Sequence, residues 1–161
     1  MELSNRVRGV AYDANVAKIT LRNVPDRPGI AASLFEPLAF AGISVDTIVQ
    51  NTGHGRMTDL SFTIARTDLQ LALKTITPIA NQSGALEVLN ESGLAKVSIV
   101  GTGMQNAPGF AARMFRALAD AQINIDMITT SEIRITCIVG EDQVKEAVNL
   151  LHETFDLDKI N

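Results

Sequence analysis

The sequence predicts an α+β protein made of two ferredoxin-like βαββαβ domains, the first inserted in the second. The main observation is an internal repeat: residues 17–21 are answered by residues 95–99, and residues 28–32 by residues 108–112. The repeat unit is a small domain, because solenoid units commonly run only from about 20 to 50 residues. In each copy, strand, helix, strand, strand and helix follow one another in the order of the split βαβ arrangement. Two copies of one module favour paired binding sites over a single catalytic centre.

The first copy opens with a strand and an amphipathic helix. Apolar and polar side chains alternate over residues 18–22, as in a half-buried strand. Turn-forming residues then break this pattern over 23–29, where Asp26 is expected to be the N-cap of the helix and Pro28 suits its first turn. The apolar residues that follow recur at helical spacing up to Gly42, which is well placed to cap the end of the helix.

The rest of the first copy completes the module. The pattern of apolar residues predicts further strands that begin at Ile43 and that cover 59–65 and 85–89. Between the last two strands, Thr67 or Asp68 is expected to cap a second helix that ends at about Ile79.

The second copy repeats this order with strands over 96–101, 124–130 and 133–139 and helices over 108–121 and 141–155. The chain then ends without a convincing fourth strand. A strand-like segment over residues 7–12 precedes the first copy, and we infer that it returns to complete the second sheet. The predicted domains are therefore 16–90 for the first, and 6–12 together with 95–157 for the second.

Composition and charge exclude several classes of protein. The net charge is −4, aromatic residues make up 4% of the 161 residues, and Trp is absent, so we expect no nucleic-acid partner. A single cysteine excludes an intrachain disulfide and cysteine-rich metal sites. No apolar run approaches the about 20 residues that span a bilayer, and the N-terminus lacks the apolar core of a signal peptide. The expectation is a cytoplasmic protein with no membrane association.

The sequence contains no convincing catalytic or cofactor motif. Gly101 and Gly103 follow a strand, but Asn106 stands where a dinucleotide-binding fingerprint needs its third glycine. The two histidines, His54 and His152, have no partner at metal-ligand spacing. Cys137 alternates with polar residues in a predicted strand and is a core thiol rather than a nucleophile. We therefore expect no catalytic residue, no metal and no cofactor.

The repeated Pro-Gly pair before each first helix is the best candidate site. Backbone N–H groups at a helix N-terminus lack partners, and the helix dipole favours an anion there, so the carboxylate of an amino acid suits this position. Small residues follow both pairs, Ala31 and Ala32 after the first, and Ala111 and Ala112 after the second, and they allow close approach. The alternative is that both pairs are ordinary turn residues.

Other polar residues occupy places where the amino group of such a ligand could be bound. A carboxylate binds an ammonium group, and an amide orients it. The residues in question, all near the ends of the middle strands, are Asp46, Gln50 and Asn51 in the first copy and Asp126, Thr130, Ser131 and Glu132 in the second. Each one taken singly could equally be a solvated strand or turn residue.

Together, residues 28–31, 48–51, 96–101 and 129–135 resemble the regulatory region of bacterial aspartate kinase, and the resemblance extends from about residue 7 to residue 157. In that family the region is a pair of ACT domains, a module that binds amino acids, with the first domain inserted in the second. The resemblance implies a non-catalytic regulatory subunit, a homodimer that partners the catalytic (alpha) subunit. It also implies feedback inhibition of lysine, threonine and methionine biosynthesis, with threonine and lysine as allosteric ligands and no cofactor.

Carried over by position, the resemblance implies two effector sites between ACT domains. The first would be formed by Asp26, Pro28, Gly29, Ile30, Ala31 and Gln50, with Asn124 and Ile125 from a facing module. The second would be formed by Met104, Asn106, Pro108, Gly109, Phe110, Ala111, Ser131 and Glu132, with Asp46 opposite. Threonine suits the first site, and lysine is the expectation for the second, where the bulky Phe110 makes the loop different.

Two related functions remain open from the sequence. The small subunit of acetolactate synthase is also a regulatory ACT protein of similar size and would bind valine. A stand-alone amino-acid sensor would need no kinase partner.

Overall fold

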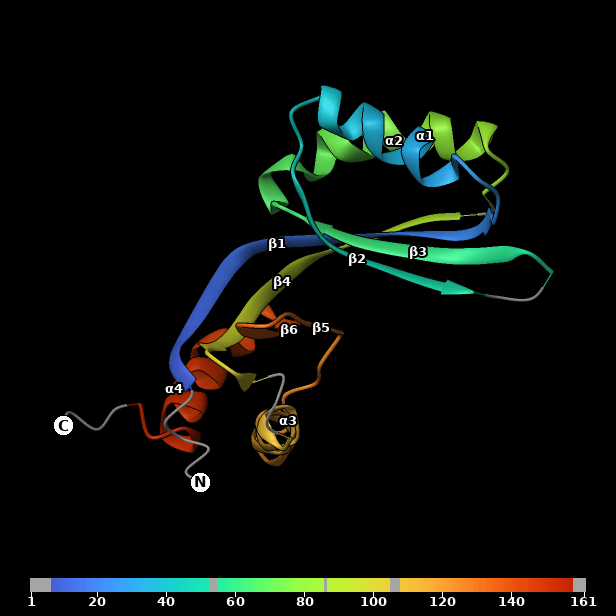
Figure 1. The fold of residues 1–161 in the computed structure, drawn as a ribbon. Helices are drawn as coiled ribbons and strands as arrows, with labels where there is room; N and C mark the ends of the chain where they lie inside the picture. The colour runs from blue at the N-terminus through green and yellow to red at the C-terminus, as the bar shows by residue number, and fades with distance from the viewer. Residues whose placement is uncertain (1–6, 53–54, 86, 105–107, 158–161) are drawn as a thin grey trace. The chain divides into compact units, whose positions relative to one another are not determined.

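The computed structural model describes residues 7–52, 55–85, 87–104 and 108–157. The chain divides into two compact units (Figure 1). Residues 15–92 form one, which we term the inserted unit, and the described residues up to Ala14 join those from Gly93 onward in the enclosing unit. The predicted fold class, two α+β modules with the first inserted in the second, is confirmed.

The inserted unit packs two helices on one face of a sheet (Figure 1). Its strand order is β2-β3-β1-β4, and β3 pairs antiparallel with both β2 and β1. The elements are β1 (Val7–Pro25), α1 (Ile30–Phe40), β2 (Val45–Thr52), β3 (Met57–Ile64), α2 (Leu69–Gln82) and β4 (Glu87–Gly101). Parts of β1 and β4 belong to the other unit.

The enclosing unit repeats this arrangement with the strand order β1-β4-β6-β5. Its further elements are α3 (Phe110–Asp120), β5 (Met127–Thr130), β6 (Arg134–Gly140) and α4 (Val144–Thr154). Val7, near the start of β1, is buried in the core of this unit. Residues 7–12, which precede the first copy in the sequence, therefore serve as the fourth strand of the second copy.

Two strands are longer than the sequence pattern indicates. Residues 7–12 and 18–22 were expected as separate strands but belong to one continuous strand, β1, and 85–89 and 96–101 are likewise joined in β4, which begins at Glu87. Within each of these long strands, polar residues between the two expected segments interrupt the apolar pattern, but the chain does not turn back there. Gly93 has a φ of 80° and makes a local irregularity in β4 rather than a turn.

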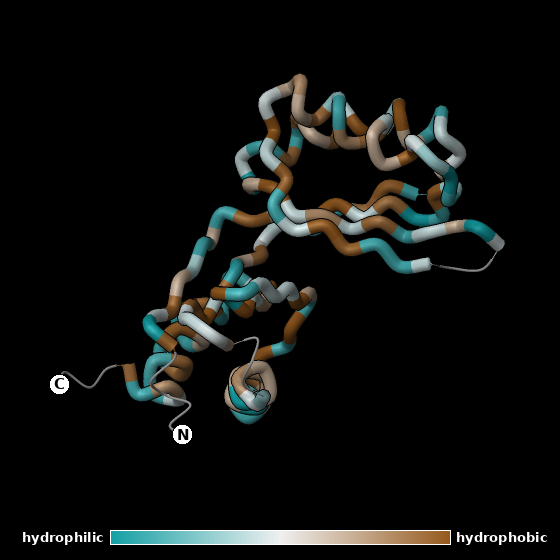
Figure 2. The backbone as a smooth tube through the Cα atoms, viewed as in Figure 1, coloured by the Kyte–Doolittle hydropathy of each residue, from teal (hydrophilic) through white to brown (hydrophobic). Residues whose placement is uncertain are grey.

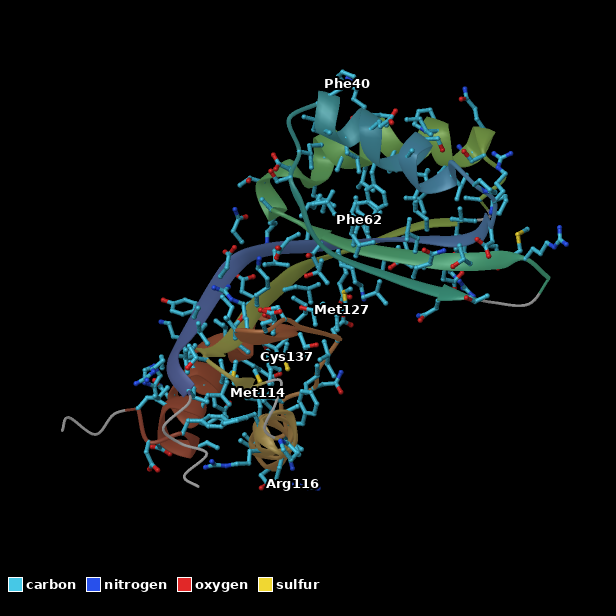
Figure 3. All side chains as sticks on the ribbon, viewed as in Figure 1. Phe40, Phe62, Met114, Arg116, Met127 and Cys137 are labelled. Atoms are coloured by element: carbon cyan, nitrogen blue, oxygen red, sulfur yellow. The ribbon has the colours of Figure 1, made fainter. Side chains whose placement is uncertain are left out.

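Each unit has its own hydrophobic core, and none of the described residues belongs to both cores. Hydrophobic and hydrophilic positions alternate along the elements that enclose them (Figure 2). In the inserted unit, Phe62 points from the sheet toward the helices, and its ring meets that of Phe35 edge to face, with the centroids 5.1 Å apart (Figure 3). In the enclosing unit, Phe110 stacks on Phe155 with the centroids 6.5 Å apart.

The α-helices end in one common motif. At the end of α1, the N–H of Gly42 donates to the carbonyl of Ala39, and the N–H of Ile43 donates to that of Leu38, both at 3.0 Å. This is a Schellman motif, which requires a residue in the left-handed region. Gly42 has a φ of 79°, so its predicted role at the helix end is confirmed. The other three described α-helices close with the same pair of bonds, and at the end of α3 Gln122 takes the left-handed place with a φ of 59°.

The start of α2 differs in detail from the prediction. A short 3-10 turn, Arg66–Asp68, precedes the helix, and Asp68 occupies the N-cap position. No side chain there makes a capping hydrogen bond, so the predicted position is confirmed and the predicted capping bond is wrong.

The thiol of Cys137 lies in the core of the enclosing unit, near Met114 (Figure 3). Burial raises its pKa from 9.0 to about 12. We expect native protein at pH 8 to react far more slowly with a thiol reagent such as DTNB than protein unfolded in urea. The thiol ionises at a lower pH in the unfolded chain than in the folded one. The contribution of the buried thiol to the free energy of unfolding is therefore complete below pH 9 and is lost as the pH rises toward 12. Rapid stoichiometric labelling of native protein would contradict this assignment.

Candidate functional site

The first candidate loop turns directly into α1 at Gly29. This residue has a φ of 87° and is the N-cap, and none of the described side chains makes a capping hydrogen bond there. The prediction that Asp26 caps the helix is therefore wrong. Asp26 is exposed, and its backbone N–H donates to the carbonyl of Arg56 at 2.7 Å. The left-handed glycine reorients the chain without help from a side chain, because glycine has no Cβ to oppose this conformation.

The N-terminus of α1 is open and positively polarised. Its first turn contains no acidic residue, and Ala31 and Ala32 are exposed. Within the described part of the chain, no atom outside the local backbone lies within 4 Å of a Cβ built at Gly29. The first backbone N–H groups of a helix have no intrahelical acceptor, and the dipole adds about half a positive charge at this end. The N–H of Ile30 donates to the carbonyl of Arg27 at 3.3 Å, so an incoming carboxylate would chiefly meet the amides that follow it in the first turn.

The second candidate loop, which leads into α3, also uses a left-handed glycine at the start of its helix. Gly109 has a φ of 106° and is the N-cap of α3, again with no side-chain cap from any residue that the structure describes, and Pro108 beside it is exposed. Ala111 is half-buried. Asn106, which the resemblance assigns to the second effector site, lies outside the described residues.

Three of the predicted site residues have their side chains in a core. Ile30 is 7% exposed, Met104 5% and Phe110 1%. Phe110 stacks on Phe155, so its bulk lies in the core of the enclosing unit rather than in the loop. A ligand at either helix N-terminus would therefore meet the backbone of Ile30 or Phe110 and not the side chain.

Gln50 lies at the same edge of the sheet as the first loop. Since β1 and β2 both pair antiparallel with β3, they run parallel to each other, and their C-terminal ends share one edge. Asp26 follows the end of β1, and Gln50 lies near the end of β2 with its side chain exposed. The structure thus groups the six residues that the first site draws from the inserted unit at one edge.

Ser131 and Glu132 occupy the corresponding edge of the enclosing unit. They form the tight turn between β5 and β6, where the N–H of Ser131 donates to the carbonyl of Arg134 at 2.8 Å. The N–H of Gly101 donates to the carbonyl of Ile133 at 2.8 Å, so this turn lies beside the end of β4, from which the second loop departs. Both side chains are exposed.

The remaining predicted residues are not brought to these loops within a single unit. Asp46 lies at the start of β2, the end of the strand opposite to Gln50. Asn124 and Ile125 lie between α3 and β5 in the enclosing unit. Their assignment depends on modules that face one another, so it stays a prediction.

Sequence reasoning missed a pair of cross-strand hydroxyl contacts. Thr20 and Ser61 lie 3.0 Å apart through their hydroxyl oxygens, and Ser98 and Thr136 lie 2.7 Å apart at the equivalent place in the second copy. The signal was present, because both copies carry a hydroxyl residue at the central polar position of the first strand. Sequence reasoning also missed the carboxylate of Asp59, which accepts a hydrogen bond from the chain just before the first loop.

A surface hollow of about 540 Å³ on the enclosing unit does not add a third candidate site. Its charged groups already have partners. The guanidinium of Arg113 donates to the carbonyl of Thr154 and lies 4.8 Å from the centre of the Phe155 ring. Arg116 forms an ion pair with Asp120 at 3.6 Å. An anion would have to displace these contacts, which makes this hollow less favourable for an anion than a helix N-terminus, where the helix dipole itself favours negative charge.

The described residues contain neither a metal-binding cluster nor a membrane-spanning helix. No three His, Cys, Asp or Glu side chains among them lie close enough to hold a metal ion. None of the described helices is long and apolar enough to cross a membrane.

Comparison with known proteins identifies the two modules. The family model described as ACT domain matches residues 21–77 and 97–155, one segment in each copy of the repeat. The aspartate kinase of Stutzerimonas stutzeri is 45% identical over 152 residues, which is 94% of this chain and 37% of that protein. The aspartokinase of Thermus thermophilus is 41% identical over 161 residues, 99% of this chain and 40% of that protein. The chain thus spans less than half the length of these relatives.

Solved structures of similar length match over nearly the whole chain. The regulatory subunit of aspartate kinase from Thermus thermophilus, in its ligand-free form, superposes with a TM-score of 0.87 at 39% identity, covering 93% of this chain and 99% of that one. A structure of aspartokinase alpha and beta subunits matches with a TM-score of 0.85 at 40% identity and the same coverage. The chain, a pair of ACT domains, therefore belongs to the regulatory regions of bacterial aspartate kinases.

Proposed function

We propose that this chain is the non-catalytic regulatory part of an aspartate kinase, and that it binds threonine at the first loop and lysine at the second. The observation that carries the proposal is the uncapped N-terminus of α1 at Gly29, in a chain whose relatives of similar length include the regulatory subunit of an aspartate kinase. Bound end product would inhibit the kinase and so regulate lysine, threonine and methionine synthesis. No cofactor is needed for this role.

The first loop suits a zwitterion. The amide N–H groups of the first turn of α1 would bind the carboxylate of threonine, since a helix N-terminus favours an anion. The carboxylate of Asp26, exposed in the same loop, would attract the ammonium group, and the side-chain amide of Gln50 at the same sheet edge would orient it. Asn124 and Ile125 of a facing module would close the site.

The second loop suits a longer ligand with a second positive charge. The N-terminus of α3 would bind the carboxylate, and Glu132, exposed in the turn at the same edge, would bind an ammonium group of lysine. Asp46 of a facing module would supply another negative charge. Because the side chain of Phe110 lies in the core, it leaves the mouth of this loop free for the ligand.

Regulation follows from differential affinity. A ligand that binds between two modules favours the arrangement in which both contact it, and it can shift the equilibrium only by the difference in its affinity for the two arrangements. Coupling of this kind commonly amounts to about 1–3 kcal/mol. We propose that the chain acts as a cytoplasmic homodimer and transmits the shift to the catalytic (alpha) subunit. One solved relative is described as containing both aspartokinase alpha and beta subunits, which supports such a partner.

Isothermal titration calorimetry of the purified chain tests the proposal. We expect threonine to bind at about one per chain, lysine to add heat to the threonine-saturated chain, and valine to give none. Valine is the matched control, because it has the shape of threonine without the hydroxyl group.

Two results would redirect the assignment. Heat with valine alone would favour the acetolactate synthase small subunit instead. An absence of heat with threonine and lysine, alone and together, would contradict the proposal for the isolated chain. If ligand binds and the chain neither associates with an aspartate kinase catalytic subunit nor changes its activity, a stand-alone amino-acid sensor becomes the better assignment.

A further inference from the structure

The strand that precedes the first loop leaves its regular pairing at Asn23. The register of β1 against β3 shifts between Leu21 and Val24, which marks a bulge, and Asn23 inside it has a φ of 55°. A left-handed backbone is costly for a residue with a Cβ, and asparagine tolerates it better than most. Asn23 lies where an ordinary ladder bond is lost, so its N–H needs another acceptor.

That acceptor is the side chain of Asp59 on β3. The backbone N–H of Asn23 donates to Oδ1 of Asp59 at 2.9 Å, in a partly buried position. A hydrogen bond to an ionised carboxylate is stronger than one between neutral groups. Asp59 therefore stabilises the bulge at the point where its backbone has lost a ladder partner.

The bulge decides where the loop starts. After it, Val24 pairs with Thr58 and Pro25 with Met57, and the N–H of Asp26 then donates to the carbonyl of Arg56 at 2.7 Å. A one-residue change in this register would reverse the direction of each following side chain. The position of Asp26 and of the chain leading to Gly29 thus depends on the bulge that Asp59 stabilises.

The neighbouring residue on β3 fixes the other segment of the same candidate site. The hydroxyl of Thr58, which is 2% exposed, donates to the carbonyl of Asn51 at 2.8 Å. Asn51 directly follows Gln50. Two consecutive β3 residues therefore position both segments, one through β1 and the other through β2.

The second copy provides an internal comparison. Thr20 pairs with Ser61 in the first copy, and Ser98 pairs with Thr136 in the second. Two residues before Ser61 is Asp59, and two residues before Thr136 is Arg134, so Arg134 is the equivalent of Asp59. A guanidinium cannot accept an N–H bond. A side-chain acceptor is not needed there, because the N–H of Gly101 donates to the main-chain carbonyl of Ile133. The two loops are thus anchored by different means.

We propose that Asp59 is a positioning residue of the first effector site: its carboxylate fixes the bulge at Asn23 and thereby the loop that binds the carboxylate of threonine. The proposal rests on the proposed function for the identity of the ligand. It assigns Asp59 no contact with the ligand, and it predicts that the second site does not depend on the equivalent residue.

The test compares D59A, D59N and R134A by threonine calorimetry and by amide hydrogen exchange of the ligand-free chain. We expect D59A to weaken threonine binding about tenfold, the effect of losing one charge-assisted hydrogen bond. D59N keeps an oxygen acceptor in the same place and should stay within about threefold of wild type. R134A, the matched change in the other copy, should leave threonine affinity unaltered.

Hydrogen exchange measures the positioning without a ligand. The amides of Asn23 and Asp26 should exchange faster in D59A than in wild type or D59N, while amides in the centre of β3 keep their wild-type rates. Unchanged exchange at Asn23 in D59A, or equal loss of threonine affinity in D59N and D59A, would overturn the proposal. If wild type itself binds no threonine, the proposed function fails, and the exchange at Asn23 alone then supports or overturns the positioning role.

Discussion

Gly29→Val is expected to reduce the affinity of the chain for threonine by about a hundredfold or more, which corresponds to about 2.7 kcal/mol of binding free energy. The φ of 87° at Gly29 is unfavourable for a β-branched residue, so α1 would begin from a distorted turn. The new side chain would also project into the open space before the helix, where the ligand carboxylate is proposed to lie. Calorimetry with threonine measures the loss.

The matched control for this change is Gly109→Val. Gly109 has a φ of 106° at the equivalent place, so both variants carry similar strain, about 1–2 kcal/mol of the free energy of unfolding. Only Gly29→Val should lower threonine affinity, whereas Gly109→Val should lower the affinity for lysine. Equal losses of threonine affinity in the two variants would show that strain, and not the position of the loop, is responsible.

Phe62→Ala is expected to lower the free energy of unfolding by about 3–5 kcal/mol. The ring is fully buried between the sheet and the helices of the inserted unit and meets Phe35 edge to face, so its removal leaves a cavity and an unpartnered ring (Figure 3). Urea unfolding followed by circular dichroism measures the change.

Phe40 offers the control for the loss of an aromatic ring in the same unit. It lies at the end of α1 with 91% of its surface exposed, so Phe40→Ala should change the free energy of unfolding by no more than about 0.5 kcal/mol. Similar destabilisation by the two variants would contradict the core assigned to Phe62.

The internal repeat made the fold predictable, because each weak local pattern occurred twice and in the same order. The order of strands and helices, the insertion, and the helix end at Gly42 all follow from patterns that the structure confirms. The helix start was harder. Sequence reasoning expected a side chain, Asp26, to cap α1, while the chain uses the left-handed backbone of Gly29, which leaves no capping signature beyond the glycine itself.

The candidate site was predictable only in part, for a physical reason. The loop residues are contiguous in sequence, so the repeat reveals them together. Asp59 acts from another strand on the backbone of Asn23, and an alternating strand pattern cannot distinguish such an acceptor from an ordinary surface carboxylate. The direction of the Phe110 side chain was also hidden, because the first residue of a helix can face either the loop or the core.

The most direct measurement is a threonine titration of the ¹⁵N-labelled chain followed by ¹H–¹⁵N NMR. If the N-terminus of α1 binds the ligand carboxylate, the largest shifts should occur at the amides of Ala31 and Ala32, with smaller ones at Asp26 and Gln50. Valine at the same concentration should leave these amides unmoved. Saturating shifts confined to other parts of the chain, or none with threonine in the millimolar range, would contradict the assignment of the first loop as an effector site.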